Sequence, residues 1–190
     1  RDNYVSYIAS RPRAQRAGAH ALFTGSDAPL VLSQIAAEVA HHPGNVWLPI
    51  ISLRREDAAR LGYDDAGQWK NLIAGYAMEM AEAMKIPWEQ FRWYAAFHDQ
   101  GHHPHIHMVC YSADGRSGYL TREGIARIKS DLAKRIFHQE LHELYERQTQ
   151  RRDELTQEAG VVMAELVQQM REGALDNPRI EQLMEHLARK

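Results

Sequence analysis

The sequence lacks most of the features that would place a protein in a membrane, in an oxidising compartment or on nucleic acid by bulk charge. Its single cysteine, Cys110, excludes an intrachain disulfide framework and fits a reducing compartment. No apolar run approaches the length needed to span a membrane, and no signal peptide is visible. Because the formal net charge is only -2, any basic surface must be local. The composition describes an ordinary soluble globular protein.

What the sequence does contain is a dense run of histidines between His98 and His107, where five of ten residues are histidine. Imidazole is usually only partly buried, and each buried ring nitrogen needs a hydrogen-bond partner, so packing alone does not explain the run. Apolar residues flank it on both sides, at 91–97 and at 108–111. This pattern predicts two strands joined by a polar turn at 99–103.

Strand geometry would bring three of these histidines together. Side chains alternate between the faces of a strand, so His105 and His107 share one face and Ile106 takes the other. If the two strands pair antiparallel, His98 lies across from the start of the second strand. Three imidazoles that converge on one point can bind a divalent metal ion. The alternative, a solvated histidine-rich turn, predicts neither the alternation nor the apolar flanks.

Hydrophobic periodicity and capping residues predict the rest of the fold. Helices are expected from Ser26–Pro29 to about Ala40, from Glu56 to Leu61 before Gly62, from Asp64–Asp65 to about Lys85, over 122–172 with a break near Phe137 or Gly160, and from Asn177–Pro178 to the end. Further strands are expected at 46–53, largely buried but with Pro49 marking an edge or bulge, and briefly at Tyr119–Leu120. The order predicts an α+β fold in which helices cover one face of an antiparallel sheet and the histidines lie on the other.

The N-terminal segment 1–16 allows two interpretations. Tyr4, Tyr7 and Ile8 have the spacing of a short helix that packs against the core, and the residues alone favour this interpretation. The segment also holds three closely spaced arginines, Arg11, Arg13 and Arg16. Since a guanidinium presents a planar fork of donors that suits phosphate, a local anion-binding strip is the alternative.

The histidine run resembles the metal motif of HUH endonucleases, and more narrowly that of MobP-type relaxases, which start conjugative DNA transfer from plasmids and integrative elements. In that family a first histidine with an acidic residue nearby precedes a His-Pro-His-x-His segment. His98, His105 and His107 fall on the three metal-ligand positions. Asp99 is the acidic residue, one place earlier than the commonest spacing, and His103 matches the further histidine before proline.

The resemblance extends to the N-terminus, where the family carries its nucleophilic tyrosine. Tyr7 and the four residues after it, Ile-Ala-Ser-Arg, match the context of that tyrosine, whereas Tyr4 lacks the following pattern and is the alternative nucleophile. With Asn45–Leu53 the match covers roughly the first 120 residues and continues into the helix after Thr121. The resemblance therefore implies an HUH relaxase core at 1–120, followed by a C-terminal helical extension at 121–190.

The activity that the resemblance implies is that of a relaxase, a site- and strand-specific DNA endonuclease and strand transferase. Tyr7 would attack single-stranded transfer-origin DNA and become joined to the 5' phosphate. One divalent ion, Mn2+ or Mg2+, held by the histidines would stabilise the growing charge. Asp99, His103 or His20 would assist deprotonation or orient a ligand ring, and DNA phosphates would lie near the three arginines.

The implied partners are single-stranded or hairpin DNA, accessory relaxosome proteins and a coupling protein, in the bacterial cytoplasm with no membrane segment. Two other functions remain as alternatives. His103–Val109 also matches the histidine triad nucleotide hydrolases, in which a histidine attacks phosphate without a metal, but this leaves His98 unexplained. The third possibility is a non-enzymatic, metal-stabilised binding module.

Overall fold

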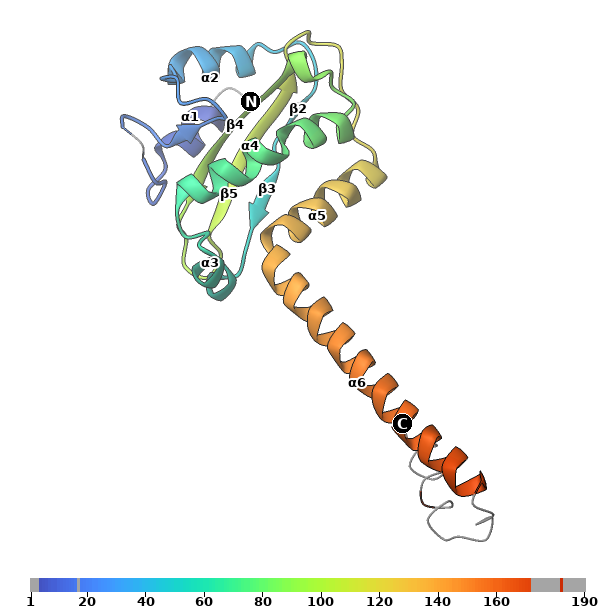
Figure 1. The fold of residues 1–190 in the computed structure, drawn as a ribbon. Helices are drawn as coiled ribbons and strands as arrows, with labels where there is room; N and C mark the ends of the chain where they lie inside the picture. Colours follow the sequence, from blue (N-terminus) through green and yellow to red (C-terminus); the bar gives the residue numbers. More distant parts are fainter. Residues whose placement is uncertain (1–3, 17, 172–181, 183–190) are drawn as a thin grey trace. The chain divides into compact units, whose positions relative to one another are not determined.

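The computed structural model describes residues 4–16, 18–171 and 182, which fall into two compact units, Arg1–Phe137 and His138–Lys190. The elements, shown in Figure 1, are α1 (Tyr4–Ser10), β1 (Leu22–Phe23), α2 (Leu32–Ala40), β2 (Val46–Trp47), β3 (Ile50–Ser52), α3 (Arg55–Leu61), α4 (Ala66–Ala83), the 3-10 turn η1 (Trp88–Gln90), β4 (Phe91–His98), β5 (His105–Ser112), α5 (Arg122–Ile136) and α6 (His138–Arg171). Among the described residues, no helix is both long and apolar enough to cross a membrane.

The first unit is built around an antiparallel sheet whose centre is the pair β4 and β5. The strand order is β1-β4-β5-β2, and β3 also pairs with β5. Strands β4 and β5 pair along their whole length, from Phe91 opposite Ser112 to His98 opposite His105. The predicted strand pair, its register and its polar turn are therefore confirmed, as is the α+β class.

Each face of this sheet carries its own apolar core, because side chains alternate along β4 and β5. Trp93 and Ile106 point to the core under α4, which lies across the sheet in Figure 1. Ala96 and Val109 point to a second core that includes buried residues of α1 and α2. Helices thus cover both faces, which corrects the prediction of one covered face. The reason lies in α1, whose buried positions recur at helical spacing and need an apolar surface.

Local signals fix the helices under the first face. The side chain of Asp65 accepts a hydrogen bond of 2.7 Å from the backbone N–H of Gly67 and so caps α4. The helix predicted from Asp64–Asp65 is present, and its apolar stripe, which includes Trp69 and Ile73, is buried. Gly62 ends α3 with a φ of 80°, a left-handed conformation that glycine adopts without strain. These predictions are confirmed.

Helix α2 begins at Leu32, later than predicted. The hydroxyl of Ser26 does accept a backbone hydrogen bond, from the N–H of Ala28 at 3.0 Å, but it closes a turn and caps no helix. Lys70, on α4, stabilises this turn, because its ammonium donates to the carbonyl of Ser26 and to the carboxylate of Asp27. The predicted helix start at Ser26–Pro29 is therefore wrong.

The segment expected as one buried strand forms two short strands, β2 and β3, that both pair with β5. The ladder is interrupted at Pro49, which has no N–H to donate, although its carbonyl accepts from the N–H of Met108 at 2.9 Å. The predicted edge position is confirmed, but the predicted burial is wrong, because Ile50 is 60% exposed. Tyr119 forms no strand either; its N–H donates to the carbonyl of Met84 at the end of α4.

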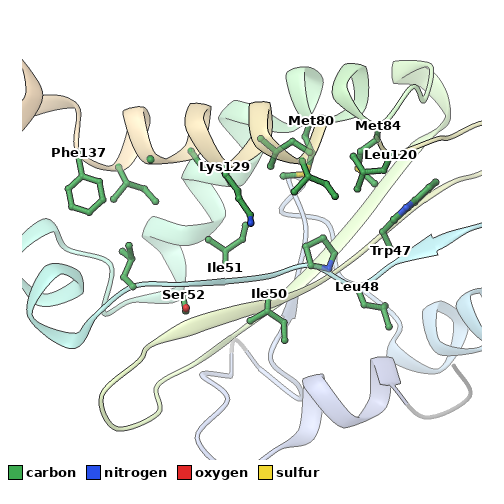
Figure 2. A pocket seen from close by; sticks show the side chains of 17 residues that line it. Trp47, Leu48, Ile50, Ile51, Ser52, Met80, Met84, Leu120, Lys129 and Phe137 are labelled. Carbon is green, nitrogen blue, oxygen red and sulfur yellow. The ribbon is translucent and has the colours of Figure 1, made fainter. Parts of the chain in front are cut away.

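An apolar groove of about 680 Å³ lies between the β2–β3 segment and helices α4 and α5 (Figure 2). Lys129 is the only charged residue among those that line it. Helix α5 begins where Thr121 accepts a hydrogen bond from the N–H of Gly124, as predicted, and ends before Phe137. Of the two breaks considered, the one near Phe137 is confirmed, because α6 runs through Gly160 without interruption. The helix predicted from Asn177–Pro178 lies outside the described residues.

Candidate metal centre

The central strand pair brings His98, His105 and His107 into one cluster on the face that carries α1. The ring centroids of His98 and His107 are 4.7 Å apart, those of His105 and His107 4.9 Å, and those of His98 and His105 5.4 Å. One ligand atom from each side chain lies within 4.8 Å of the others. The predicted convergence of three imidazoles is thus confirmed among the described residues.

Main-chain carbonyls determine which nitrogen carries the proton in two of the rings. Nε2 of His98 lies 2.8 Å from the carbonyl oxygen of Ile8, and because a carbonyl only accepts, Nε2–H must be the donor. The buried Nδ1 of His98 has no hydrogen-bond partner in the part of the chain that the structure describes. In the same way, Nδ1–H of His105 donates to the carbonyl of His103 at 2.9 Å. Each ring is left with one lone pair that can bind a metal.

His107 completes the cluster with a side-chain partner. Its Nδ1 lies 3.1 Å from the hydroxyl oxygen of Tyr4, and its Nε2 lies 3.2 Å from Nε2 of His105. Nitrogens that bind the same ion at about 2.1 Å are about 3.0 to 3.4 Å from each other, depending on the coordination geometry. The spacing of the two Nε2 atoms and the unpartnered Nδ1 of His98 therefore fit a divalent ion.

Burial and neighbouring positive charge favour the neutral form of two rings of the cluster, those of His98 and His107. Burial lowers the pKa of His98, and the neighbouring His105 and the guanidinium of Arg11 lower it further. Burial, together with His98, His105 and Arg11, lowers the pKa of His107 to about 4. Only a neutral imidazole offers a lone pair to a metal. His98 and His107 are thus in their metal-binding form at neutral pH without any change in protonation.

Helix α1 presents two tyrosines beside the cluster, in different environments. Tyr4 is half-buried, and burial raises its pKa, as does the proximity of Tyr7. Tyr7 lies one helical turn later and is 49% exposed. The guanidinium carbon of Arg11 lies 5.2 Å from the centre of the Tyr7 ring, within the range of a cation–π contact. The exposed phenol and a fixed positive charge therefore lie together at the edge of the cluster.

The segment after α1 runs along the end of β4. Ala14 forms a bridge with His98, and the carbonyl of Arg13 accepts a hydrogen bond from the N–H of Asp99 at 3.1 Å. Arg11 is partly buried, whereas Arg13 and Arg16 are exposed. Of the three predicted phosphate-binding arginines, the structure brings Arg11 to the histidines and to Tyr7, and leaves the other two facing solvent.

Asp99 forms an ion pair with Arg55, with 2.5 Å between Oδ1 and a guanidinium nitrogen. Arg55 also donates from Nε to the carbonyl of Gly101 and from its backbone N–H to the carbonyl of His102. It thus holds the whole turn that leads into β5. Sequence reasoning missed Arg55, because nothing in a pair of arginines before a short helix indicates contact with a turn more than forty residues away.

The two proposed histidine assistants are held by main-chain contacts. Nδ1 of His20 accepts from the N–H of Leu22 at 3.1 Å, and its Nε2–H donates to the carbonyl of Leu30 at 3.0 Å. Both ring nitrogens of His20 therefore stabilise its loop. His103 is exposed, and its carbonyl is the group that orients His105. The structure shows no contact of either ring with the described tyrosines of α1.

Three imidazoles on an antiparallel sheet, next to an exposed tyrosine and a guanidinium, form a site suited to metal-assisted phosphoryl transfer. The family model of the MobL relaxases matches residues 2–190, and the chain belongs to this family. Family membership supports DNA nicking as the general activity and the DNA of a transfer origin as the substrate. Neither a curated protein nor a solved structure matches the chain.

Proposed function

We propose that this chain is a site- and strand-specific relaxase that nicks single-stranded transfer-origin DNA through a covalent link between Tyr7 and the 5' phosphate. The observation that carries the proposal is the cluster of three histidines beside the helix that bears Tyr7. A histidine triad hydrolase would leave His98 without a role, yet His98 is fully buried in the cluster. A binding module would need no exposed tyrosine next to it.

His98, His105 and His107 would hold one divalent ion, with the carbonyls of Ile8 and His103 keeping two of the rings in the required tautomer. When bound, the ion supplies positive charge that stabilises the phosphate during in-line attack. An all-nitrogen set favours a transition-metal ion such as Mn2+ over Mg2+, which prefers oxygen ligands.

Tyr7 is the better nucleophile of the two tyrosines because its hydroxyl is accessible. The hydroxyl of Tyr4 is half-buried against His107, and burial raises its pKa, both of which oppose attack. The guanidinium of Arg11, beside the Tyr7 ring, would attract the phosphate. In the reaction a bond forms between Tyr7 Oη and phosphorus, and the bond from phosphorus to the 3' oxygen breaks. The phenol proton passes to solvent, and the departing 3' oxygen takes up a proton from solvent to become the free 3' hydroxyl.

The products explain how the strand is later resealed. One phosphoester replaces another, so the free 3' hydroxyl can attack the phosphotyrosine and regenerate the DNA without ATP. The DNA phosphates would follow Arg11, Arg13 and Arg16 along the end of β4, which makes binding dependent on salt. Accessory relaxosome proteins and a coupling protein would act on the same DNA. The chain would divide into a catalytic core at 1–120 and a helical extension at 121–190.

The test is capture of the covalent product. The protein is incubated with Mn2+ and a single-stranded oligonucleotide that contains its own transfer origin, and the product is separated under denaturing conditions. We expect a protein–DNA adduct in which mass spectrometry locates the nucleotide on Tyr7. Tyr7→Phe should abolish the adduct but still bind the oligonucleotide, because it removes only the attacking oxygen. An adduct that persists in Tyr7→Phe would contradict the assignment of the nucleophile.

A further inference from the structure

The three histidines of the cluster differ in what holds their second ring nitrogen. His98 and His105 are held by the main-chain carbonyls of Ile8 and His103. His107 is held by a side chain, the hydroxyl of Tyr4, at 3.1 Å. The Tyr4 and His107 rings also meet edge to face, with centroids 6.1 Å apart and an interplanar angle of 77°. Among the described residues, Tyr4 is thus the one hydrogen-bond partner of the three rings that a side-chain substitution can remove.

The hydroxyl of Tyr4 controls which nitrogen of His107 is available. If Nε2 binds an ion, Nδ1 must carry the proton, and this proton is donated to the oxygen of Tyr4. The lone pair of His107 Nε2 is then free to bind the ion that Nε2 of His105, 3.2 Å from it, would share. Without the hydroxyl, the ring loses the partner that selects this tautomer, and burial leaves Nδ1 with an unsatisfied donor.

Tyr4 also ties the metal centre to the nucleophile. Tyr4 and Ile8 are four residues apart on α1, and they contact His107 and His98 respectively. Tyr7 lies between these two contacts along the helix. The same two hydrogen bonds therefore orient two metal ligands and fix the helix that carries the attacking oxygen.

We propose that Tyr4 is a positioning residue of the metal centre: its hydroxyl orients His107 for metal binding and takes no part in the attack on DNA. The proposal rests on the proposed function and assigns separate roles to the two tyrosines of α1. A residue that only packs would be replaced by phenylalanine without consequence, because phenylalanine keeps the ring contact with His107. Tyr4→Phe thus removes the hydroxyl and retains the packing.

The first measurement is the affinity of the full chain for Mn2+ in the absence of DNA. Binding is monitored by the electron paramagnetic resonance signal of the free ion. Since loss of an outer hydrogen bond to a metal-binding histidine typically costs about 10- to 100-fold in affinity, we expect a weakening of at least about tenfold in Tyr4→Phe. Tyr7→Phe is the matched control on the same helix and should bind Mn2+ as the wild type does. The visible spectrum of bound Co2+ should change in Tyr4→Phe and not in Tyr7→Phe.

The second measurement separates positioning from nucleophilic attack. The Mn2+ concentration that gives half the maximal rate of adduct formation should rise by at least about tenfold in Tyr4→Phe, in line with the lost affinity. The rate at saturating Mn2+ should stay close to that of the wild type, because Tyr7 is unchanged. A Tyr4→Phe protein that forms no adduct at any Mn2+ concentration, although folded, would overturn the proposal.

A third measurement does not depend on a substitution. Nitrogen-15 NMR of the imidazoles in the wild-type protein with a diamagnetic ion, Zn2+, should show His107 protonated at Nδ1. Protonation at Nε2, or a Tyr4→Phe variant that binds Mn2+ with unchanged affinity, would refute the role of Tyr4. If the wild type forms an adduct on Tyr7, such results leave the proposed function intact. If the wild type binds no Mn2+ and forms no adduct, the proposed function itself fails.

Discussion

The two faces of the β4–β5 pair share one backbone and perform different tasks. On one face Ile106, Met108 and Cys110 are fully buried among apolar side chains, and burial raises the pKa of Cys110 to about 12. On the other face, the alternate positions His105 and His107 form the cluster with His98. Because the side-chain period of a strand is two, a single strand supplies both core residues and the histidines of the cluster. The comparison indicates that stability and chemistry can be disturbed independently on β5.

The largest expected effect comes from removing one of the three proposed metal ligands. His105→Ala deletes a partly buried ring whose loss leaves a small cavity, so the fold should survive while Mn2+ affinity and adduct formation each fall by at least about 100-fold. The matched control on the opposite face is Met108→Ala. It should lower the free energy of unfolding by about 2 to 5 kcal/mol, because it empties a fully buried site, and leave Mn2+ affinity unchanged. Loss of Mn2+ binding in both variants would contradict the separation of the two faces.

A second effect concerns pH in the metal-free protein. The pKa of His107 falls from 6.5 to about 4 on folding, so between these values the unfolded chain binds a proton that the folded protein excludes. The free energy of unfolding should therefore decrease as the pH falls from 6.5 to 4, by about 3 kcal/mol from this residue. Denaturant unfolding in the presence of a chelator should show a shallower decline in His107→Gln. Parallel pH profiles for the two proteins would contradict this prediction.

The smallest expected effect is that of Arg55→Ala, which releases the turn between the two strands. Its ion pair with Asp99 is partly exposed, so the loss of global stability should be less than about 1 kcal/mol. Hydrogen exchange of the amides at 99–103 should nevertheless accelerate, because Arg55 also holds the carbonyls of Gly101 and His102. Arg60→Ala, which removes an ion pair within α3, is the control and should leave the turn unaffected.

The sequence predicted the parts of the site that depend on short-range geometry. His98, His105 and His107 converge because a strand alternates and a six-residue connection, 99–104, returns the chain to its neighbour, and both follow from local residue patterns. The caps at Asp65 and Thr121 were found for the same reason.

The remaining features depend on contacts between distant segments. Tyr4 and His107 are 103 residues apart, and no local pattern indicates that α1 packs on the histidine face. The exposure of Ile50 also escaped prediction, because an apolar run does not reveal which strand lies at the edge of the sheet. Ser26 has the residue type of a helix cap, but its turn is held by Lys70 and is separate from α2, which begins at Leu32. Lys70 is distant in the sequence, so no local pattern indicates this contact.

The attachment of α1 has a mechanical consequence. This helix has seven residues, and its described hydrogen bonds to the rest of the unit include those of Tyr4 with His107, of Ile8 with His98 and of Ala9 with Ala21. If a DNA strand joined to Tyr7 were pulled by a translocating partner, these contacts and the buried side chains of α1 would carry the load. Two of the hydrogen bonds end on histidines of the cluster, so tension on the strand would be transmitted to the proposed metal site.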